Sequence, residues 1–167
     1  KTAVFSAVVL YLILGWFLGC NSNIFKMCYF VYIATDEVLE TSSFVPNETL
    51  LYLEKPSENE LEGLKEKFSK KNIYYVGSDQ GCSCGFLYEI DEDFEDDEND
   101  KDSPQKLIDF ITELTKNQDI ELYCCWSGEE DFPIISNKIL DIRKITLDNY
   151  FGPHDKEFIT FSKQNYL

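Results

Sequence analysis

The residues whose types and spacing could do chemistry gather in one short stretch, the loop from Gly77 to Gly85. It contains Cys82 and Cys84, one residue apart, with glycines on either side. Side chains at positions i and i+2 of a strand point the same way, so both sulfurs could be presented to one metal ion. Neighbouring glycines would let the backbone approach a ligand closely. The pattern makes Cys82 and Cys84 candidate metal ligands or reactive thiols.

A complete zinc site needs two further ligands, and no second matching pair of cysteine or histidine residues is evident in the sequence. In the sheet that we predict, Cys84 and the pair Cys124 and Cys125 lie at opposite ends of their strands, so they cannot easily share one cluster. We therefore expect no cofactor, with zinc held by Cys82 and Cys84 as the alternative. The plainer interpretation is a bulged hairpin loop that carries small, half-buried thiols.

Tyrosines flank the same loop and favour binding over reaction. Aromatic side chains combined with a few backbone amides suit a small ligand or a peptide. We predict a binding or interaction module whose site consists of Tyr74, Tyr75, Gly77, Cys82, Cys84 and Tyr88. The alternative is a thiol- or metal-dependent enzyme that uses Cys82 and Cys84, so whether the protein is an enzyme stays open.

The elements that would position this site follow from the periodicity of the flanking sequence. Strands are expected at 28–34, 49–54, 73–76, 85–90, 120–126, 142–147 and 156–161. Ser57 and Glu60 form a capping box that begins a helix to about Lys70, and Ser103 with Pro104 begins a second helix. The order predicts an α+β, two-layer fold: a ferredoxin-like βαββαβ core with additional strands, and both helices on one face of a mainly antiparallel sheet.

The amino-terminal segment is almost continuously apolar as far as Cys20, which is long enough for a hydrophobic helix that crosses a bilayer. Its last four residues, 17–20, resemble a bacterial lipoprotein signal, in which the cysteine receives the lipid. We expect residues 1–20 to be a signal peptide or membrane anchor, with Cys20 as the lipid attachment site. A single α+β domain would follow at 21–167, tethered to the cell membrane or envelope. If the real start is Met27, the protein is cytoplasmic.

Acidic residues dominate the charge, with a formal net charge of −16. Such a surface repels phosphate backbones, so nucleic acid is excluded as a partner that binds through a basic patch. The run 91–102 is expected to be a solvated acidic loop. A helix-loop-helix calcium site needs Gly at its sixth position and Glu at its twelfth, where this run has Asp96 and Asp102.

Four segments, 27–34, 68–70, 74–78 and 81–86, together resemble a family of small uncharacterised bacterial proteins. The Gly-Cys-x-Cys-Gly-Phe motif at 81–86 is the most specific part of the likeness, which covers most of Met27 to Phe161. Members of that family tend to begin at the equivalent of Met27. No activity comes with the resemblance, so it implies a shared fold and no function.

Overall fold

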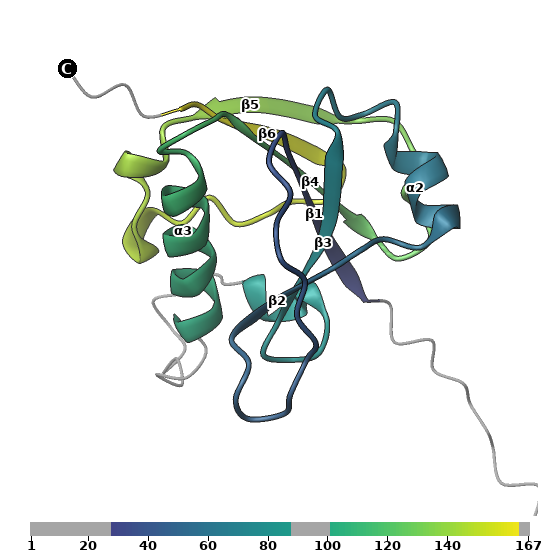
Figure 1. The fold of residues 1–167 in the computed structure, drawn as a ribbon. Coiled ribbons are helices and arrows are strands. Elements are labelled where there is room, and N and C mark those ends of the chain that lie inside the picture. Colours follow the sequence, from purple (N-terminus) through teal and green to yellow (C-terminus); the bar gives the residue numbers. More distant parts are fainter. Residues whose placement is uncertain (1–27, 88–100, 164–167) are drawn as a thin grey trace, which may run out of the picture.

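The computed structural model describes residues 28–87 and 101–163 of the chain. Its centre is a six-stranded sheet in the order β2-β3-β1-β4-β6-β5, with an α-helix on either side (Figure 1). The strands are β1 Tyr29–Thr35, β2 Leu51–Glu54, β3 Asn72–Ser78, β4 Ile120–Trp126, β5 Ser136–Leu140 and β6 Glu157–Phe161. The helices are α2 Glu58–Leu64 and α3 Asp102–Leu114, and the short 3-10 helices are η1 Ser83–Phe86, η3 Ile142–Lys144 and η4 Leu147–Asn149. The predicted α+β class is confirmed.

The apolar run that begins at Cys28 forms the central strand β1, as its composition predicts. The strand is fully buried from Val31 to Ala34, because its side chains are covered on both faces of the sheet. β1 pairs antiparallel with β3 on one side and with β4 on the other. β5 and β6 are parallel, and the other described pairs are antiparallel. The prediction of a mainly antiparallel sheet is confirmed.

Alternating side chains of β1 divide the core into two layers, one on each face of the sheet. Val31 and Ile33 belong to the same hydrophobic cluster as Leu107 of α3. Tyr32 belongs to the other cluster, together with Leu64 of α2. The two helices therefore cover opposite faces, and the prediction that both lie on one face is wrong (Figure 1). Strands that are apolar on both sides need other elements to cover both faces of the sheet. The apolar stripe of a helix does not indicate against which face of the sheet the helix will pack.

The predicted ferredoxin-like order is also wrong. β2 and β3 are antiparallel neighbours in the sheet, whereas a ferredoxin-like unit would run two strands joined by a helix in parallel. The strand expected at 85–90 is replaced at its start by η1, and residues 88–90 lie outside the described part of the chain. The strand expected at 142–147 begins as η3, because the Asp141 side chain accepts a hydrogen bond from the Arg143 N–H and favours a turn.

The capping box of α2 is confirmed, but the helix ends at Leu64 instead of about Lys70. The chain after it turns toward β4, where the buried carboxylate of Glu121 accepts hydrogen bonds from the Ser69 N–H at 2.8 Å and the Lys70 N–H at 3.3 Å. These N–H groups are therefore satisfied by a side chain from a distant strand. The contact holds residues 69 and 70 in a non-helical connection, and no local sequence signal marks it.

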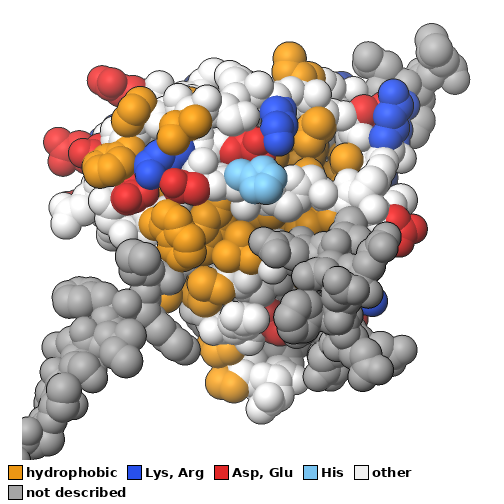
Figure 2. Space-filling view, turned by 180° about the vertical axis from the view of Figure 1, so that it is seen from behind, with side chains coloured by type: hydrophobic (Ala, Val, Ile, Leu, Met, Phe, Trp, Pro, Cys, Tyr) orange, Lys and Arg blue, Asp and Glu red, His pale blue; other side chains and the backbone are white. Residues whose placement is uncertain are grey.

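The edge strand β5 leaves apolar side chains in solvent. Ile139 of β5 is 75% exposed, and Ile135, directly before the strand, is 74% exposed. Hydrophobic side chains also gather, among charged ones, on the surface seen from behind (Figure 2). Lys138 lies on the same strand, and its ammonium is 2.6 Å from Oε1 of Glu157. Lysine on an edge strand opposes pairing with another chain, so β5 carries a common device against aggregation.

Several predicted features lie outside the described residues. They are the signal peptide or anchor at 1–20, the lipid site Cys20, Tyr88, and most of the acidic run at 91–102. Within residues 28–87 and 101–163, no helix is long and apolar enough to cross a membrane.

Candidate functional site

The loop after β3 folds back on itself through the Ser78 side chain. The Ser78 hydroxyl donates to the Cys82 carbonyl at 2.6 Å and accepts from the Gly85 N–H at 3.0 Å. Gly81 has a φ of +70°, which favours glycine at this turn. The Cys82 sulfur then accepts a hydrogen bond from the Cys84 N–H at 3.4 Å and caps η1. These contacts turn the expected hairpin strand into a short helix.

The side chains of η1 complete the start of β1. The hydroxyl of Ser83 accepts from the Val31 N–H at 3.0 Å and donates to the Val76 carbonyl at 2.6 Å, which joins β1 to β3. The sulfur of Cys84 accepts from the Tyr29 N–H at 3.3 Å. Ser83 was not a predicted site residue, although it stands between the two cysteines and is fully buried. The Gly-Cys-x-Cys-Gly-Phe motif at 81–86 therefore has a structural role, since it completes the hydrogen bonding of β1.

The two cysteines of the motif face different surroundings. Cys82 lines a pocket on the α2 face, whereas Cys84 packs against the core under α3. Burial, followed by a hydrogen bond with the Cys84 thiol, raises the pKa of Cys82 to about 12. The thiolate is the nucleophile and the metal ligand, so this environment keeps Cys82 in its unreactive form at neutral pH.

The expectation that Cys84 and Cys124 lie at opposite ends of the sheet is wrong. Cys84 contacts the N–H of Tyr29, which pairs with Trp126 at the end of β4, so Cys84 lies near the end of the sheet that Cys124 approaches. Cys124 and Cys125 are fully buried and belong to the two opposite core layers. Within the described ranges, no three or more His, Cys, Asp or Glu side chains are grouped so as to hold a metal ion.

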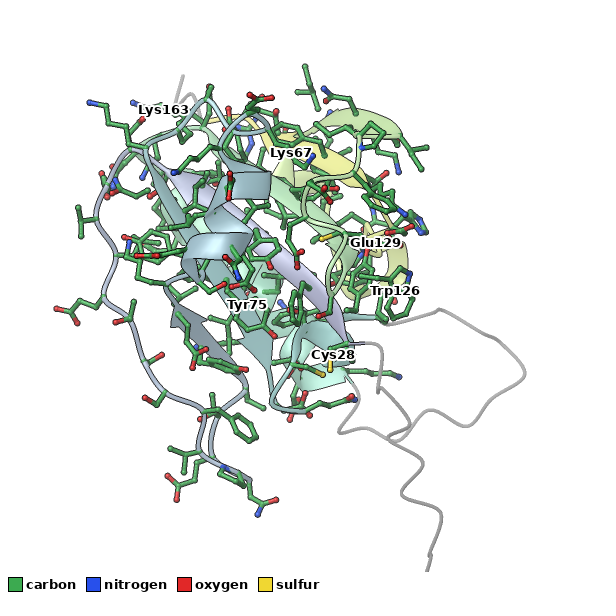
Figure 3. All side chains as sticks on the ribbon, turned by 90° about the vertical axis from the view of Figure 1, so that its right-hand side faces the viewer. Cys28, Lys67, Tyr75, Trp126, Glu129 and Lys163 are labelled. Carbon is green, nitrogen blue, oxygen red and sulfur yellow. The ribbon has the colours of Figure 1, made fainter. Side chains whose placement is uncertain are left out.

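A pocket of about 260 Å³ opens beside Cys82, on the face of the sheet that α2 covers. Figure 3 looks at this side of the molecule and labels Tyr75 and Cys28, which both line it. The complete lining is Cys28, Phe30, Tyr52, Glu54, Lys55, Pro56, Glu60, Tyr75, Gly81 and Cys82. The pocket therefore draws on β1, β2, β3, α2 and the loop before η1.

Aromatic rings from three strands form the sheet side of this pocket. The Phe30 ring lies 5.1 Å from the Tyr75 ring at 77°, and the Tyr52 ring lies 6.0 Å from it at 63°. Tyr32 also meets Tyr75 edge to face, at 5.9 Å. Gly77 does not line the pocket but makes room for it, since it pairs with Tyr52 across the strands. Steeply inclined rings of this kind form a rigid wall.

Two carboxylates converge on the hydroxyl of Tyr32. Oε1 of Glu60 lies 2.9 Å from it, and Oε1 of Glu130 lies 3.3 Å from it. The capping box fixes Glu60, because its Oε2 accepts the Ser57 N–H at 2.6 Å. Burial and these two carboxylates raise the pKa of Tyr32 well above its ordinary value, so the hydroxyl stays a donor. In the described part of the chain, neither carboxylate forms an ion pair with Lys or Arg.

The structure brings together part of the predicted site. Tyr75 and Cys82 line the pocket, and Gly77 supports it. Tyr74 instead lies in the core on the opposite face, where its hydroxyl accepts from the Leu39 N–H at 2.7 Å. The pocket residues that sequence reasoning did not predict as site residues are Cys28, Phe30, Tyr52, Glu54, Lys55, Pro56, Glu60 and Gly81. The spacing of Tyr52 and Glu54, two apart on a strand, would have placed both on one face.

Comparison of the chain with protein-family models, with curated proteins and with solved structures finds no match. The fold and the pocket are therefore the basis for any functional assignment. The resemblance to a bacterial family through the Gly-Cys-x-Cys-Gly-Phe motif stays a prediction.

Proposed function

We propose that this protein is a binding module whose pocket on the α2 face takes a small ligand or a single side chain of a partner. The observation that carries the proposal is the convergence of Phe30, Tyr52 and Tyr75, from three different strands, on one pocket. Its volume of about 260 Å³ is just below the range of roughly 300–1,000 Å³ typical of sites for drug-sized ligands. A small group fits this space better than a large cofactor.

The surroundings of Cys82 favour binding over thiol chemistry. An enzyme that used this thiol would need a lowered pKa, and burial has the opposite effect here. Aromatic rings and carboxylates line the pocket together with this thiol. The proposed tether to a membrane rests on the apolar segment at 1–20, independently of the pocket.

Aromatic proton and carbon NMR signals of the folded protein can test the proposed pocket. The probes are benzylamine, benzamide and benzoate, which share one ring and differ in charge. We expect at least one probe to cause saturable shifts in the ring signals of Phe30, Tyr52 and Tyr75. The substitution Phe30→Leu removes one ring and keeps most of the apolar volume, so it should abolish or weaken the effect.

The matched control is Phe132→Leu, which makes the same change at a half-exposed ring that does not line the pocket. This variant should keep the shifts. Absence of any response to these three probes and to the ammonium probes of the next subsection would contradict the proposed function. Shifts that persist unchanged in Phe30→Leu would contradict the assignment to this pocket.

A further inference from the structure

We propose that the pocket recognises an organic cation, the ammonium or guanidinium group of a small amine or of a basic side chain. This inference rests on the proposed function, since it names the chemical class of the ligand for the same pocket. Three features carry it: the aromatic wall, the carboxylates beside that wall, and a pair of carboxylates at the Tyr32 hydroxyl with which no Lys or Arg of the described chain pairs.

The aromatic wall is the first feature. The face of an aromatic ring is negative and its edge is positive, and an organic cation within about 6 Å of the ring centre is attracted to the face. Phe30 and Tyr52 are inclined to Tyr75 by 77° and 63°. Rings at such angles can offer faces to one cation from more than one side, whereas a parallel stack would offer only its outermost faces. This arrangement resembles the aromatic cages that hold quaternary ammonium groups.

The carboxylates are the second feature. Glu54 points to the same face of β2 as Tyr52 and lies opposite Tyr75 in the neighbouring strand. Glu60 reaches the pocket from α2 and is fixed by its bond to the Tyr32 hydroxyl. A cation against the rings would therefore have a carboxylate from β2 and another from α2 close by. An anionic ligand would be repelled by both.

The third feature is a local excess of negative charge. Glu130 shares the Tyr32 hydroxyl with Glu60 and is 8% exposed. Glu60 is half-buried, and two carboxylates that share one hydroxyl repel each other unless a cation accompanies them. Within the described part of the chain, no Lys or Arg pairs with either one. A bound cation would supply the missing charge, and the net charge of −16 would draw cations toward the protein.

The one lysine in the pocket lining does not fill this role. The ammonium of Lys55 lies 3.6 Å from the centre of the Tyr74 ring, which belongs to the core layer on the opposite face. Its charge is therefore directed away from Phe30, Tyr52 and Tyr75. Lys67 likewise lies 5.1 Å from the centre of the Tyr123 ring, whereas no lysine or arginine of the described residues lies over the ring of Phe30, Tyr52 or Tyr75.

Choline and its uncharged isostere, in which carbon replaces the quaternary nitrogen, provide the decisive comparison because they have the same shape. Titrations followed by the ring signals of Phe30, Tyr52 and Tyr75 give the affinity of each. We expect choline to bind about tenfold more tightly than the isostere, through its attraction to the rings and the carboxylates. Binding should weaken at about 1 M salt, where the screening length falls to about 3 Å.

The variant Glu60→Gln tests the carboxylate while keeping the fold, since glutamine also serves in a capping box. It should reduce the affinity for choline by about threefold to tenfold. The matched control is Glu58→Gln, at an exposed position of the same helix that does not line the pocket. This control should leave the affinity unchanged.

The capped tripeptide acetyl-Gly-Lys-Gly-amide distinguishes the two sources of the cation. Tighter binding of the tripeptide than of choline would assign the pocket to a basic side chain of a partner, and the reverse order to a small free organic cation. Either order supports recognition of a cation. Equal binding of choline and its isostere would overturn it, and so would preferential binding of benzoate, although the proposed binding function would survive both results. If no probe of either series binds, both proposals fail.

Discussion

The ring of Tyr52 lies over Gly77, its partner across the β2–β3 ladder. A Cβ atom at Gly77 would lie 2.0 Å from the Cζ atom of that ring. No side chain fits beneath the ring, so glycine is required for Tyr52 to reach its place 6.0 Å from Tyr75. The glycine that looked like part of a loop is therefore the support of the aromatic wall.

Replacement of Gly77 by alanine should destabilise the protein, because the added methyl group forces Tyr52 out of its position. Overpacking of this kind costs about 1–3 kcal/mol. Urea unfolding followed by circular dichroism measures the change in the free energy of unfolding.

A double-mutant cycle shows whether the loss comes from Tyr52. In the background of Tyr52→Leu, which removes the far end of the ring, Gly77→Ala should cost less than it does in the original protein. An equal cost in both backgrounds would mean that the backbone at Gly77, and not the ring, is what the alanine disturbs.

Loss of the Ser83 hydroxyl should also destabilise the fold. Ser83→Ala leaves the N–H of Val31 and the carbonyl of Val76 without their partner in a fully buried place. An unsatisfied buried group costs about 1–3 kcal/mol. The same measurement on Ser127→Ala, at an exposed turn, should give a change within about 0.5 kcal/mol. If Ser83→Ala leaves the free energy of unfolding unchanged, the structural role that we assign to the motif is wrong.

Buried tyrosines make stability fall in alkaline solution. Burial is the largest cause that raises the pKa of Tyr29, Tyr32 and Tyr75 well above 10.0. From about pH 10 upward the unfolded chain loses these protons and the native protein keeps them, so the unfolded state binds fewer protons and the free energy of unfolding decreases. This contribution is fully present below that pH.

Urea midpoints between about pH 8 and pH 11 measure this effect, and Tyr32→Phe provides the control. Each buried tyrosine contributes a slope of up to about 1.4 kcal/mol per pH unit above its unfolded pKa. The variant should therefore show a shallower decline than the original protein. A decline of the same slope in both proteins would show that the pKa of Tyr32 is the same in the folded and the unfolded state.

Thiol alkylation should be slow at Cys82. Its raised pKa leaves little thiolate near pH 8, so iodoacetamide should modify it more slowly in the folded protein than after unfolding in urea. Peptide mass spectrometry at successive times gives the rate for each cysteine. Cys124, which is fully buried and has a pKa raised by burial, is the internal reference for slow reaction. Reaction of Cys82 at the unfolded rate would revive the thiol-enzyme alternative.

Local signals in the sequence predicted individual elements well. The apolar run after Cys28 indicated a central strand, and Ser57 with Glu60 indicated the start of α2. Both signals depend on residues a few positions apart, so the sequence alone contains them. The capping role of Glu60 was clear, whereas its second bond, to the hydroxyl of Tyr32 on β1, was not.

The prediction of a strand at 85–90 was wrong because contacts with residues far away in the sequence decide the local structure there. Its first residues form η1 because Ser83 and Cys84 bond to the N–H groups of Val31 and Tyr29, more than fifty positions earlier in the chain. A local pattern of glycines, cysteines and aromatic residues does not indicate a hydrogen-bond partner on a distant strand. The contact depends on the pairing of β1 with β3.

By itself the sequence determined the α+β class, the central strand, the capped helix and the acidic character of the protein, because these depend on composition and on neighbours along the chain. Only the tertiary structure decided that α2 and α3 cover opposite faces, that the cysteine motif completes β1, and that Tyr75 shares a pocket with Phe30 and Tyr52. The physical reason is that a pocket is defined by side chains from separate strands, and their meeting depends on strand order and register, which the periodicity of one strand does not contain.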